Sequence, residues 1–236
     1  MVIPVEIWDL PVGGKLLQEW RDDPSFPERV AEAAVSAATL RAWDAATARA
    51  LAAVRHVHLA GGGATAAIEA AIAARGPRCT RDDDPFTAAR FGARTHGLCA
   101  DIGQTSIKFA RAAAPGVDVV RIPRDPARAP MRDEVPGDQR DAARTTTIDF
   151  LASLLAGART ALVALPCEII AGVPRSCSYC WRDPDPDLVP DLARRSGAAI
   201  DIVNDAVLAA HAAPVPRDPT LVLTIGFGVG GAILLP

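Results

Sequence analysis

The chain has 236 residues, of which 50% are hydrophobic and 5% aromatic, and its formal net charge is −3. This length suits one large domain or two small lobes, with ample apolar material for a core. Arginines are scattered and form no basic stripe, which argues against a nucleic-acid partner. No apolar run is long enough to cross a bilayer, and the acidic start is unlike a signal peptide, so we expect a cytoplasmic protein without a membrane partner.

The N-terminal part of the chain is predicted to alternate strands and helices. Apolar positions at helical spacing predict one long helix or a broken pair over Glu28–Val54. Asp84 and Pro85 suit the start of another helix as cap and first residue. The expected elements are a strand Val5–Leu10, the helix or pair Glu28–Val54, a strand Val57–Leu59, a helix Thr65–Ala74, a strand Arg78–Arg81 and a helix Pro85–Arg94.

The middle of the chain has a complete β-β-β-α-β-α-β-α pattern. Tight turns separate its first three strands, and a Pro-rich loop, Pro123–Arg140, leads into its first helix. The expected strands are Leu98–Gly103, Ser106–Ala112, Val117–Ile122, Ala161–Leu165 and Ala199–Asn204, and the expected helices are Thr145–Ala158, Leu188–Arg195 and Ala206–Ala213. Residues 98–213 are therefore predicted to form one lobe.

The C-terminal segment is predicted to be a hairpin, with strands Leu221–Ile225 and Ala232–Leu235 around a turn Gly226–Gly231. When it is placed before residues 1–97, the order again becomes β-β-β-α-β-α-β-α. We infer a circular permutation, in which residues 1–97 and 220–236 form a second lobe, since such rearrangements are well tolerated. The interpretation requires Val5–Leu10 to share a sheet with Leu221–Leu235.

Three glycine-bearing segments are candidates for binding phosphate or nucleotide. Asp101–Lys108 lies on a predicted hairpin, where Gly103 allows close approach of a phosphate and Gln104 and Thr105 offer donors. Gly226, Gly228 and Gly230 belong to a second glycine-dense turn, whose amides can surround an anion. Gly61, Gly62 and Gly63 join a strand to a helix N-terminus, a place suited to a nucleotide. Each segment alone is equally typical of an ordinary turn.

Asn204 and Asp205 end one strand and begin a helix. Alone they would be read as helix-capping residues. Together with the three glycine segments, placed at equivalent points of two similar halves, they form a more specific pattern. We therefore expect the phosphate tail of a nucleotide to bind between the Asp101–Lys108 and Gly226–Gly231 turns.

The pattern resembles the actin/hexokinase/Hsp70 ATPase superfamily, and within it the ROK family of bacterial sugar kinases and repressors. Asp-Ile-Gly-Gln-Thr-Ser-Ile-Lys resembles the first phosphate motif, and Leu-Thr-Ile-Gly-Phe-Gly-Val-Gly-Gly-Ala-Ile the second. Val-Asn-Asp-Ala resembles the Asn-Asp-Ala motif, and His-Leu-Ala-Gly-Gly-Gly-Ala the adenosine motif. The resemblance covers nearly the whole chain in permuted order. It implies an α/β fold of two duplicated actin-like (ribonuclease H-like) lobes with a central cleft.

The resemblance also implies a reaction, an ATP-dependent transfer of the γ-phosphate to a hydroxyl of a sugar-like small molecule. Asp205 would be the general base, and Asp101 would hold Mg²⁺ through water. The phosphates would bind to the two turns, with Lys108 and Phe227 among the contacts, and the adenosine to Gly61–Gly63. Phosphoryl transfer depends chiefly on positioning and charge neutralisation, which such an arrangement supplies. A homodimer is also possible.

Some residues depart from the family pattern. Gln104 replaces a usual glycine, and the bulky Phe227 stands where a small or hydroxylated residue is expected. The family's Cys-rich zinc motif and its Glu-x-x-His segment are missing, and the part of the second lobe that would hold them is short. The alternative is therefore a nucleotide-binding protein without catalysis, such as a degenerate kinase, a sensor or a scaffold.

The segment after Pro166 is expected to shape the acceptor site or to be an exposed loop. Its candidate acceptor contacts, with Asn204, are Glu168, Arg175, Tyr179 and Trp181. The same segment contains Cys167, Cys177 and Cys180, three of the five cysteines. A single Cys-x-x-Cys is weak evidence for a metal site, so we expect reduced structural thiols or thiols lining the pocket.

Overall fold

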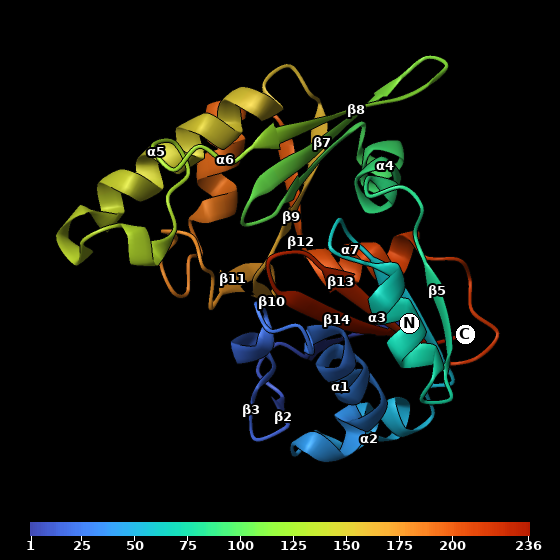
Figure 1. The fold of residues 1–236 in the computed structure, drawn as a ribbon. Helices are drawn as coiled ribbons and strands as arrows, with labels where there is room; N and C mark the ends of the chain where they lie inside the picture. Colours follow the sequence, from blue (N-terminus) through green and yellow to red (C-terminus); the bar gives the residue numbers. More distant parts are fainter. The chain divides into compact units, whose positions relative to one another are not determined.

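Two five-stranded sheets, each in its own unit of the chain, form the framework of the protein (Figure 1). The computed structural model describes all residues from Met1 to Pro236. Unit 1 comprises Met1–Thr87 and Ala209–Pro236, and unit 2 comprises Ala88–Leu208. Each unit is described by itself below.

Unit 2 contains the uninterrupted copy of the predicted pattern. Its sheet has the order β12-β9-β6-β7-β8, with β6, β7 and β8 antiparallel and β9 and β12 parallel to β6. Its strands are β6 (Leu98–Ile102), β7 (Ser106–Ala113), β8 (Gly116–Pro123), β9 (Thr160–Leu165), β10 (Glu168–Ile170), β11 (Val173–Arg175) and β12 (Ala199–Asn204), and its helices are α4 (Thr87–His96), α5 (Arg140–Leu155), α6 (Leu188–Ser196) and α7 (Asp205–Ala212), the last of which crosses the boundary between the units. Two 3₁₀ turns, η2 (Arg132–Glu134) and η3 (Gly137–Gln139), precede α5.

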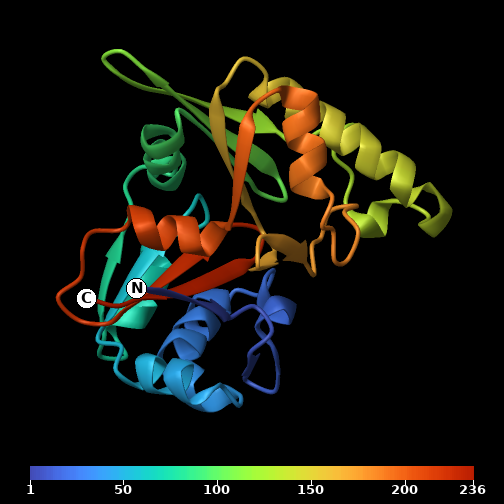
Figure 2. The same ribbon diagram turned by 180° about the vertical axis from the view of Figure 1, so that it is seen from behind.

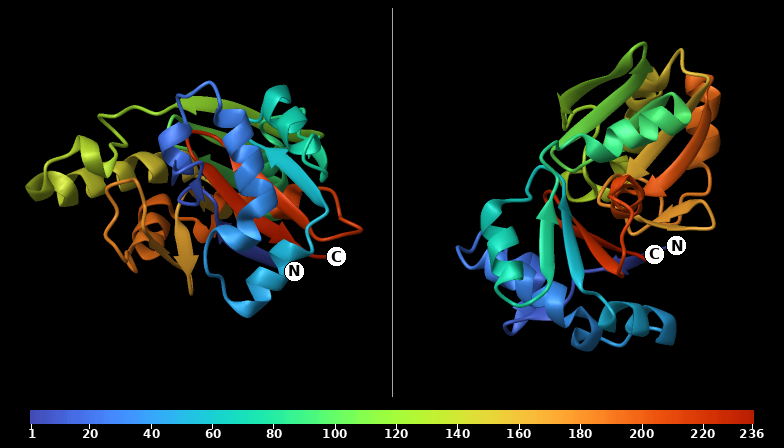
Figure 3. Two further views of the ribbon diagram at one scale, coloured as in Figure 1. Left: turned by 60° about the horizontal axis from the view of Figure 1, so that its bottom comes forward. Right: turned by 90° about the vertical axis from the view of Figure 1, so that its right-hand side faces the viewer.

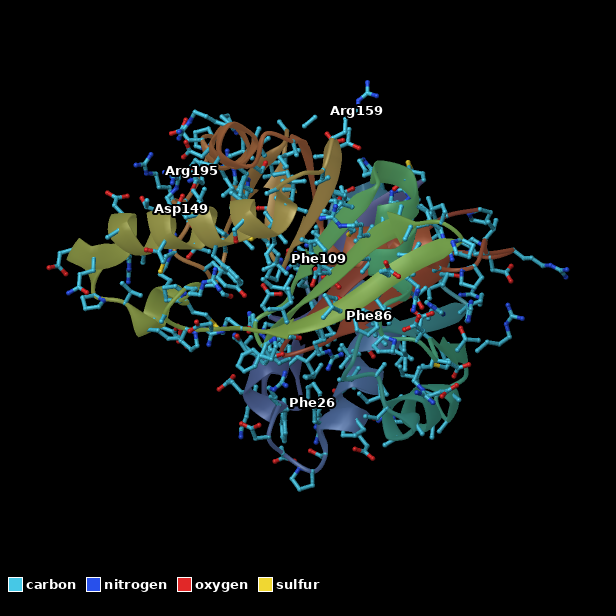
Figure 4. All side chains as sticks on the ribbon, turned by 90° about the horizontal axis from the view of Figure 1, so that it is seen from above. Phe26, Phe86, Phe109, Asp149, Arg159 and Arg195 are labelled. Atoms are coloured by element: carbon cyan, nitrogen blue, oxygen red, sulfur yellow. A yellow bond between two sulfur atoms is a disulfide. The ribbon has the colours of Figure 1, made fainter.

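Alternate residues of the unit 2 strands enter two different cores, because side chains of a strand point to opposite faces of its sheet. Leu98, Ala100 and Ile102 pack with the buried residues of α5 and α6. Cys99 of the same strand packs instead with Ala89 of α4. The helices α5 and α6 lie side by side and are linked by an ion pair between Asp149 and Arg195 (Figure 4).

Unit 1 repeats this plan from two separated stretches of chain. Its sheet has the order β1-β14-β13-β4-β5, in which β1, β14 and β13 are antiparallel and β4 and β5 are parallel to β13. Its elements are β1 (Val2–Glu6), β2 (Pro11–Val12), β3 (Lys15–Leu16), η1 (Leu17–Trp20), α1 (Phe26–Leu40), α2 (Ala45–Ala52), β4 (His56–Ala60), α3 (Ala66–Ala73), β5 (Arg78–Arg81), β13 (Thr220–Ile225) and β14 (Val229–Leu234).

The core of unit 1 lies between this sheet and the helices α1, α2 and α3 (Figure 3). Of the two alternatives predicted for Glu28–Val54, one long helix or a broken pair, the structure shows the pair. The break falls at Asp44, whose carboxylate accepts hydrogen bonds from the Ala46 and Thr47 amides and so caps the start of α2. The hydrogen bond from the Thr47 hydroxyl, followed by those from the Thr47 and Ala46 amides, holds the pKa of Asp44 below its usual value.

The predicted sheet partnership between the two ends of the chain is confirmed. β1 pairs antiparallel with β14, with Val2 opposite Leu234 and Glu6 opposite Gly230. The Leu235 amide also donates to the Met1 carbonyl at 2.9 Å, and the termini lie side by side (Figure 2). The duplicated β-β-β-α-β-α-β-α fold class is likewise confirmed, while the circular permutation itself stays a hypothesis.

Several predicted boundaries are wrong for identifiable reasons. The turn Gly226–Gly231 ends early, since β14 already begins at Val229, and α5 begins at Arg140, within the expected loop. The loop after Pro166 contains the β10–β11 hairpin, whose strands are too short to show a periodic pattern. Helix α4 belongs to unit 2 because its small residues pack on that sheet, and the end of α7 belongs to unit 1, which shifts both expected lobe boundaries.

None of the helices combines the length and the apolar composition that crossing a membrane requires.

Candidate functional site

A cavity of about 330 Å³ in unit 1 brings two of the predicted nucleotide segments together. It opens between the start of α1, the loop from β4 to α3, and the end of β13. Its lining residues are Arg21, Asp22, Asp23, Phe26, Pro27, Gly63, Thr65, Ile68, Ile225 and Gly226. Phe26 stands at the start of α1, as labelled in Figure 4. The lining combines apolar surface with one cationic and two acidic side chains, as small-molecule sites commonly do.

Close backbone packing joins the Gly61–Gly63 loop to the end of β13. The Gly63 amide donates to the Ile225 carbonyl at 2.8 Å. Gly61 has φ +90°, and a Cβ atom there would lie 2.6 Å from the Ile225 carbonyl oxygen. Thr65 then caps α3 by accepting from the Ile68 amide. The glycines of this loop thus allow a close approach to the backbone of the protein itself, at Ile225. Gly62 is exposed at the tip of the loop.

The β13–β14 turn consists of Gly226, Phe227 and Gly228. The Gly226 amide donates to the Gly228 carbonyl at 2.9 Å, and Phe227 is 45% exposed at the tip. The guanidinium of Arg21 lies over the Phe227 ring, 4.5 Å from its centroid, and Arg21 Nη1 donates to the Gly226 carbonyl at 3.0 Å. Sequence reasoning missed Arg21, because no motif includes it.

The other two glycines of this segment lie on β14, outside the turn, which corrects the predicted bounds of the turn. Gly230 is a residue of β14, paired with Glu6 and Thr224 on either side. Gly231 follows it, and a Cβ atom there would lie 2.6 Å from Ile7 Cγ1 and 2.9 Å from Val5 Cγ2. The glycine density that favoured a phosphate turn therefore arises partly from the close packing of β1 on β14.

In unit 2, Asp101 and Lys108 lie opposite each other on β6 and β7. Lys108 Nζ donates to Asp101 Oδ2 at 2.7 Å, and both side chains are largely shielded from solvent. A shielded ion pair of this kind is costly to break from one side, because the remaining charge loses its partner. The Asp101 carboxylate, which was predicted to hold Mg²⁺ through water, is therefore paired with the Lys108 ammonium group of the same hairpin.

The turn between these two strands is held from outside by the segment after β11. Tyr179 is fully buried, and its hydroxyl donates to the Gly103 carbonyl at 2.7 Å. Gln104 Nε2 donates to Ser178 Oγ at 2.9 Å, and the Arg124 amide donates to the Thr105 carbonyl at 2.9 Å. Burial raises the pKa of Tyr179 to about 12, so its hydroxyl keeps its proton at neutral pH.

These contacts give Tyr179 and Gln104 structural roles at the turn. Tyr179 supports the turn from inside the core, beside the equally buried Trp181. The Gln104 side chain reaches the same segment through Ser178. Arg124, whose amide holds the Thr105 carbonyl, also donates two hydrogen bonds from its side chain to the Glu134 carboxylate, at 2.6 and 2.7 Å. These bonds lower the pKa of Glu134 to about 2. Contacts between such distant segments leave no local sequence pattern.

Asn204 and Asp205 lie at the end of β12 and the start of α7. Asn204 Oδ1 accepts from the Ala206 and Val207 amides, so Asn204 caps the helix. Its Nδ2 donates to the Cys167 carbonyl at 2.9 Å, which ties the strand end to the segment before β10. Asp205 is half-buried and accepts from the Ala206 amide at 2.8 Å.

The expectation of reduced thiols is wrong for one pair, because Cys167 and Cys177 form a disulfide across the base of the β10–β11 hairpin. The hairpin exposes Glu168 and Arg175, which face each other in register, so these two acceptor candidates lie together at the surface. Cys180 is a buried free thiol, and burial raises its pKa. No group of three or more His, Cys, Asp or Glu side chains is placed to bind a metal.

Two of the solved structures that are similar to this chain are described as kinases. One is a protein of Cytophaga hutchinsonii assigned to the sugar kinases, with 15% identity, a TM-score of 0.39, and coverage of 59% of this chain and 48% of that one. The other is a ROK hexokinase of Thermus thermophilus, with 20% identity, a TM-score of 0.33, and coverage of 58% and 46%. This chain thus spans about half the length of either structure.

No protein-family model matches the chain, and no curated protein matches it significantly by sequence.

Proposed function

We propose that the protein is an ATP-dependent phosphotransferase that moves the γ-phosphate to a hydroxyl of a sugar-like small molecule. The cavity of unit 1 carries the proposal, because it joins Gly63 and Gly226, two residues that the sequence predicts to bind the nucleotide. Its size suits a nucleoside, and its apolar walls at Phe26 and Ile68 suit a base.

The chemistry is assigned to unit 2. Asp205 would take the proton from the acceptor hydroxyl, since a positioned carboxylate can act as general base in phosphoryl transfer. Lys108 would neutralise charge on the transferred phosphate. Asn204 orients the strand end by capping α7, while the exposed Glu168 and Arg175 would contact the acceptor.

Asp101 would hold Mg²⁺ through a bound water molecule. Its carboxylate is of the right chemical kind for Mg²⁺, and its Oδ2 already accepts from Lys108. Mg²⁺ retains several waters and uses one or two carboxylates together with substrate phosphates, so a water-mediated contact suits this donor set. When bound, Mg²⁺ supplies charge neutralisation of the phosphates.

Two measurements test the proposal. MgATP should raise the melting temperature, as any ligand of the native state does. A screen of sugars for ADP release should then find an acceptor whose phosphorylation is lost in Asp205→Asn. No thermal shift at millimolar ATP would reject nucleotide binding altogether.

The alternative is a nucleotide-binding protein without catalysis. The observation that favours it is Phe227, a bulky side chain on the turn assigned to the phosphates. A thermal shift with ATP but no ADP release with any acceptor would support this alternative. The cytoplasmic location and the homodimer are also proposals, testable by fractionation and by light scattering.

A further inference from the structure

Arg21 is held beside the β13–β14 turn by two contacts of different kinds. It immediately follows η1, and its Nη1 donates to the Gly226 carbonyl at 3.0 Å. Its guanidinium carbon Cζ also lies over the Phe227 ring, 4.5 Å from the ring centroid. The hydrogen bond and the ring hold the guanidinium at two points. Arg21 thus has a defined orientation although it is only half-buried.

The same side chain lines the cavity next to Gly226. Arginine has five N–H donors in a rigid plane, and the Gly226 bond uses one nitrogen of that plane. The nearby Asp23 carboxylate is engaged elsewhere, since it accepts from the Ser25 amide and hydroxyl. A cation of fixed orientation therefore stands at the Gly226 end of the cavity.

We propose that Arg21 binds the phosphate groups of the nucleotide and that Phe227 positions it for this task. The proposal rests on nucleotide binding in the cavity of unit 1, as proposed above. Arginine is the side chain best suited to phosphate, because its paired donors match two phosphate oxygens. Phe227, which departs from the small residue expected on this turn, is then the platform on which the guanidinium stacks.

The acidic residues of the cavity set the direction of the nucleotide. Asp22 and Asp23 precede α1 and line the same cavity as Arg21. They repel phosphate and can accept hydrogen bonds from hydroxyl or amino groups. The phosphates therefore lie toward Arg21 and Gly226, and the nucleoside lies toward the start of α1.

Calorimetric titration with ADP and with adenosine tests the proposal on the purified full chain. Arg21→Gln should weaken ADP binding about ten- to a hundredfold, the range for one charge-assisted contact, and leave adenosine binding unchanged. Phe227→Leu should weaken ADP binding about two- to fivefold, because it removes only the stacking. The double variant should resemble Arg21→Gln, since Phe227 acts through Arg21.

Arg41→Gln is the matched control. Arg41 also stacks on an aromatic ring of unit 1, with Cζ 4.0 Å from the Trp43 centroid, but it does not line the cavity. It should leave ADP binding unchanged. Arg21→Lys keeps the charge and should retain part of the affinity that Arg21→Gln loses.

The outcomes separate the two proposals. If neither ADP nor adenosine binds the wild-type protein at millimolar concentration, the proposed nucleotide function fails. If ADP binds and Arg21→Gln binds it equally well, only the role of Arg21 is overturned. An equal loss for ADP and adenosine in Arg21→Gln would also overturn it, as would tighter ADP binding by Phe227→Leu.

Discussion

The β6–β7 turn of unit 2 and the β13–β14 turn of unit 1 occupy the same place in the same topology, yet they are held differently. Side chains of a distant segment, Tyr179 and Ser178, hold the first turn through Gly103 and Gln104. The second is held by direct backbone contact with the Gly61–Gly63 loop and by Arg21. Duplicated topology therefore fixes where a turn lies but leaves its support to be built separately in each unit.

The largest expected effect is a loss of turnover in a unit 2 variant that leaves nucleotide binding, assigned to unit 1, intact. Asp205→Asn in unit 2 should lower turnover roughly 10²–10⁴-fold, because it removes the proposed general base. The melting-temperature shift caused by MgATP should persist, because the cavity proposed to bind the nucleotide belongs to unit 1. Coupled measurement of ADP release with an identified acceptor tests this, and turnover at the wild-type rate would rule out Asp205 as the base.

Gly61→Ala should break the backbone contact that holds the unit 1 turn. The new Cβ would lie 2.6 Å from the Ile225 carbonyl oxygen at φ +90°, so we expect a loss of roughly 3 kcal/mol in the free energy of unfolding. Gly76→Ala is the control, since φ is +109° there but no atom lies within 4 Å. Urea denaturation should show the smaller cost of about 1–2 kcal/mol for Gly76→Ala. Equal losses would mean that close approach contributes nothing.

Reduction of the Cys167–Cys177 disulfide should loosen the segment that supports the unit 2 turn. The closed loop has a sequence separation of 10. Chain entropy for a loop of this length predicts a loss of about 2–3 kcal/mol in the free energy of unfolding.

Thiol titration of the denatured chain checks this assignment directly. Three thiols should react before reduction and five after it. Limited proteolysis should then show faster cleavage between β10 and α6 in the reduced protein. Five reactive thiols in a sample never exposed to reductant would contradict the disulfide.

Tyr179→Phe should weaken the support of the unit 2 turn while keeping the buried ring. The Gly103 carbonyl loses its donor, at a cost of about 1–2 kcal/mol in stability. Hydrogen exchange should be faster at the Gly103 amide, which donates to Ser106 across the turn. Exchange at the Gly226 amide in unit 1 is the internal control and should not change. A change at both turns would mean that they do not depend on separate supports.

The smallest expected effect is a pH dependence of stability that arises from His56 in the sheet of unit 1. Burial, followed by the nearby charges of Arg78 and His58, holds the pKa of His56 below its ordinary value of 6.5, although Asp218 opposes the shift. The ring also faces the hydroxyls of Thr80 and Thr220.

Because the folded state disfavours the protonated ring, the unfolded chain binds the proton more readily. Stability should therefore fall as the pH drops through 6.5 and stop falling once it lies below the folded pKa. His56→Asn should remove this pH-dependent loss of stability from melting temperatures measured at a series of pH values around and below 6.5. An unchanged pH profile in the variant would show that His56 contributes none of it.

Local patterns in the sequence were sufficient to predict the type and order of the main elements. The strands Arg78–Arg81 and Ala199–Asn204 lie where they were expected, and the equivalence of the two halves followed from that order. Periodic apolar positions and capping residues such as Asn204 act through near neighbours, so they can be read without coordinates. The motif residues Gly63 and Gly226 were likewise found from sequence before they were seen to share a cavity.

Only the tertiary structure decided what each motif residue contacts. Gly231 allows β1 to pack closely on β14, Tyr179 donates a hydrogen bond to the Gly103 carbonyl, and Arg21 lines the cavity of unit 1. These roles depend on segments that are 76 to more than 200 residues apart, whose meeting is set by the cooperative burial of whole sheet faces. The sequence by itself thus determined the elements and the candidate motifs, whereas packing between distant segments decided which of those residues remain exposed for binding.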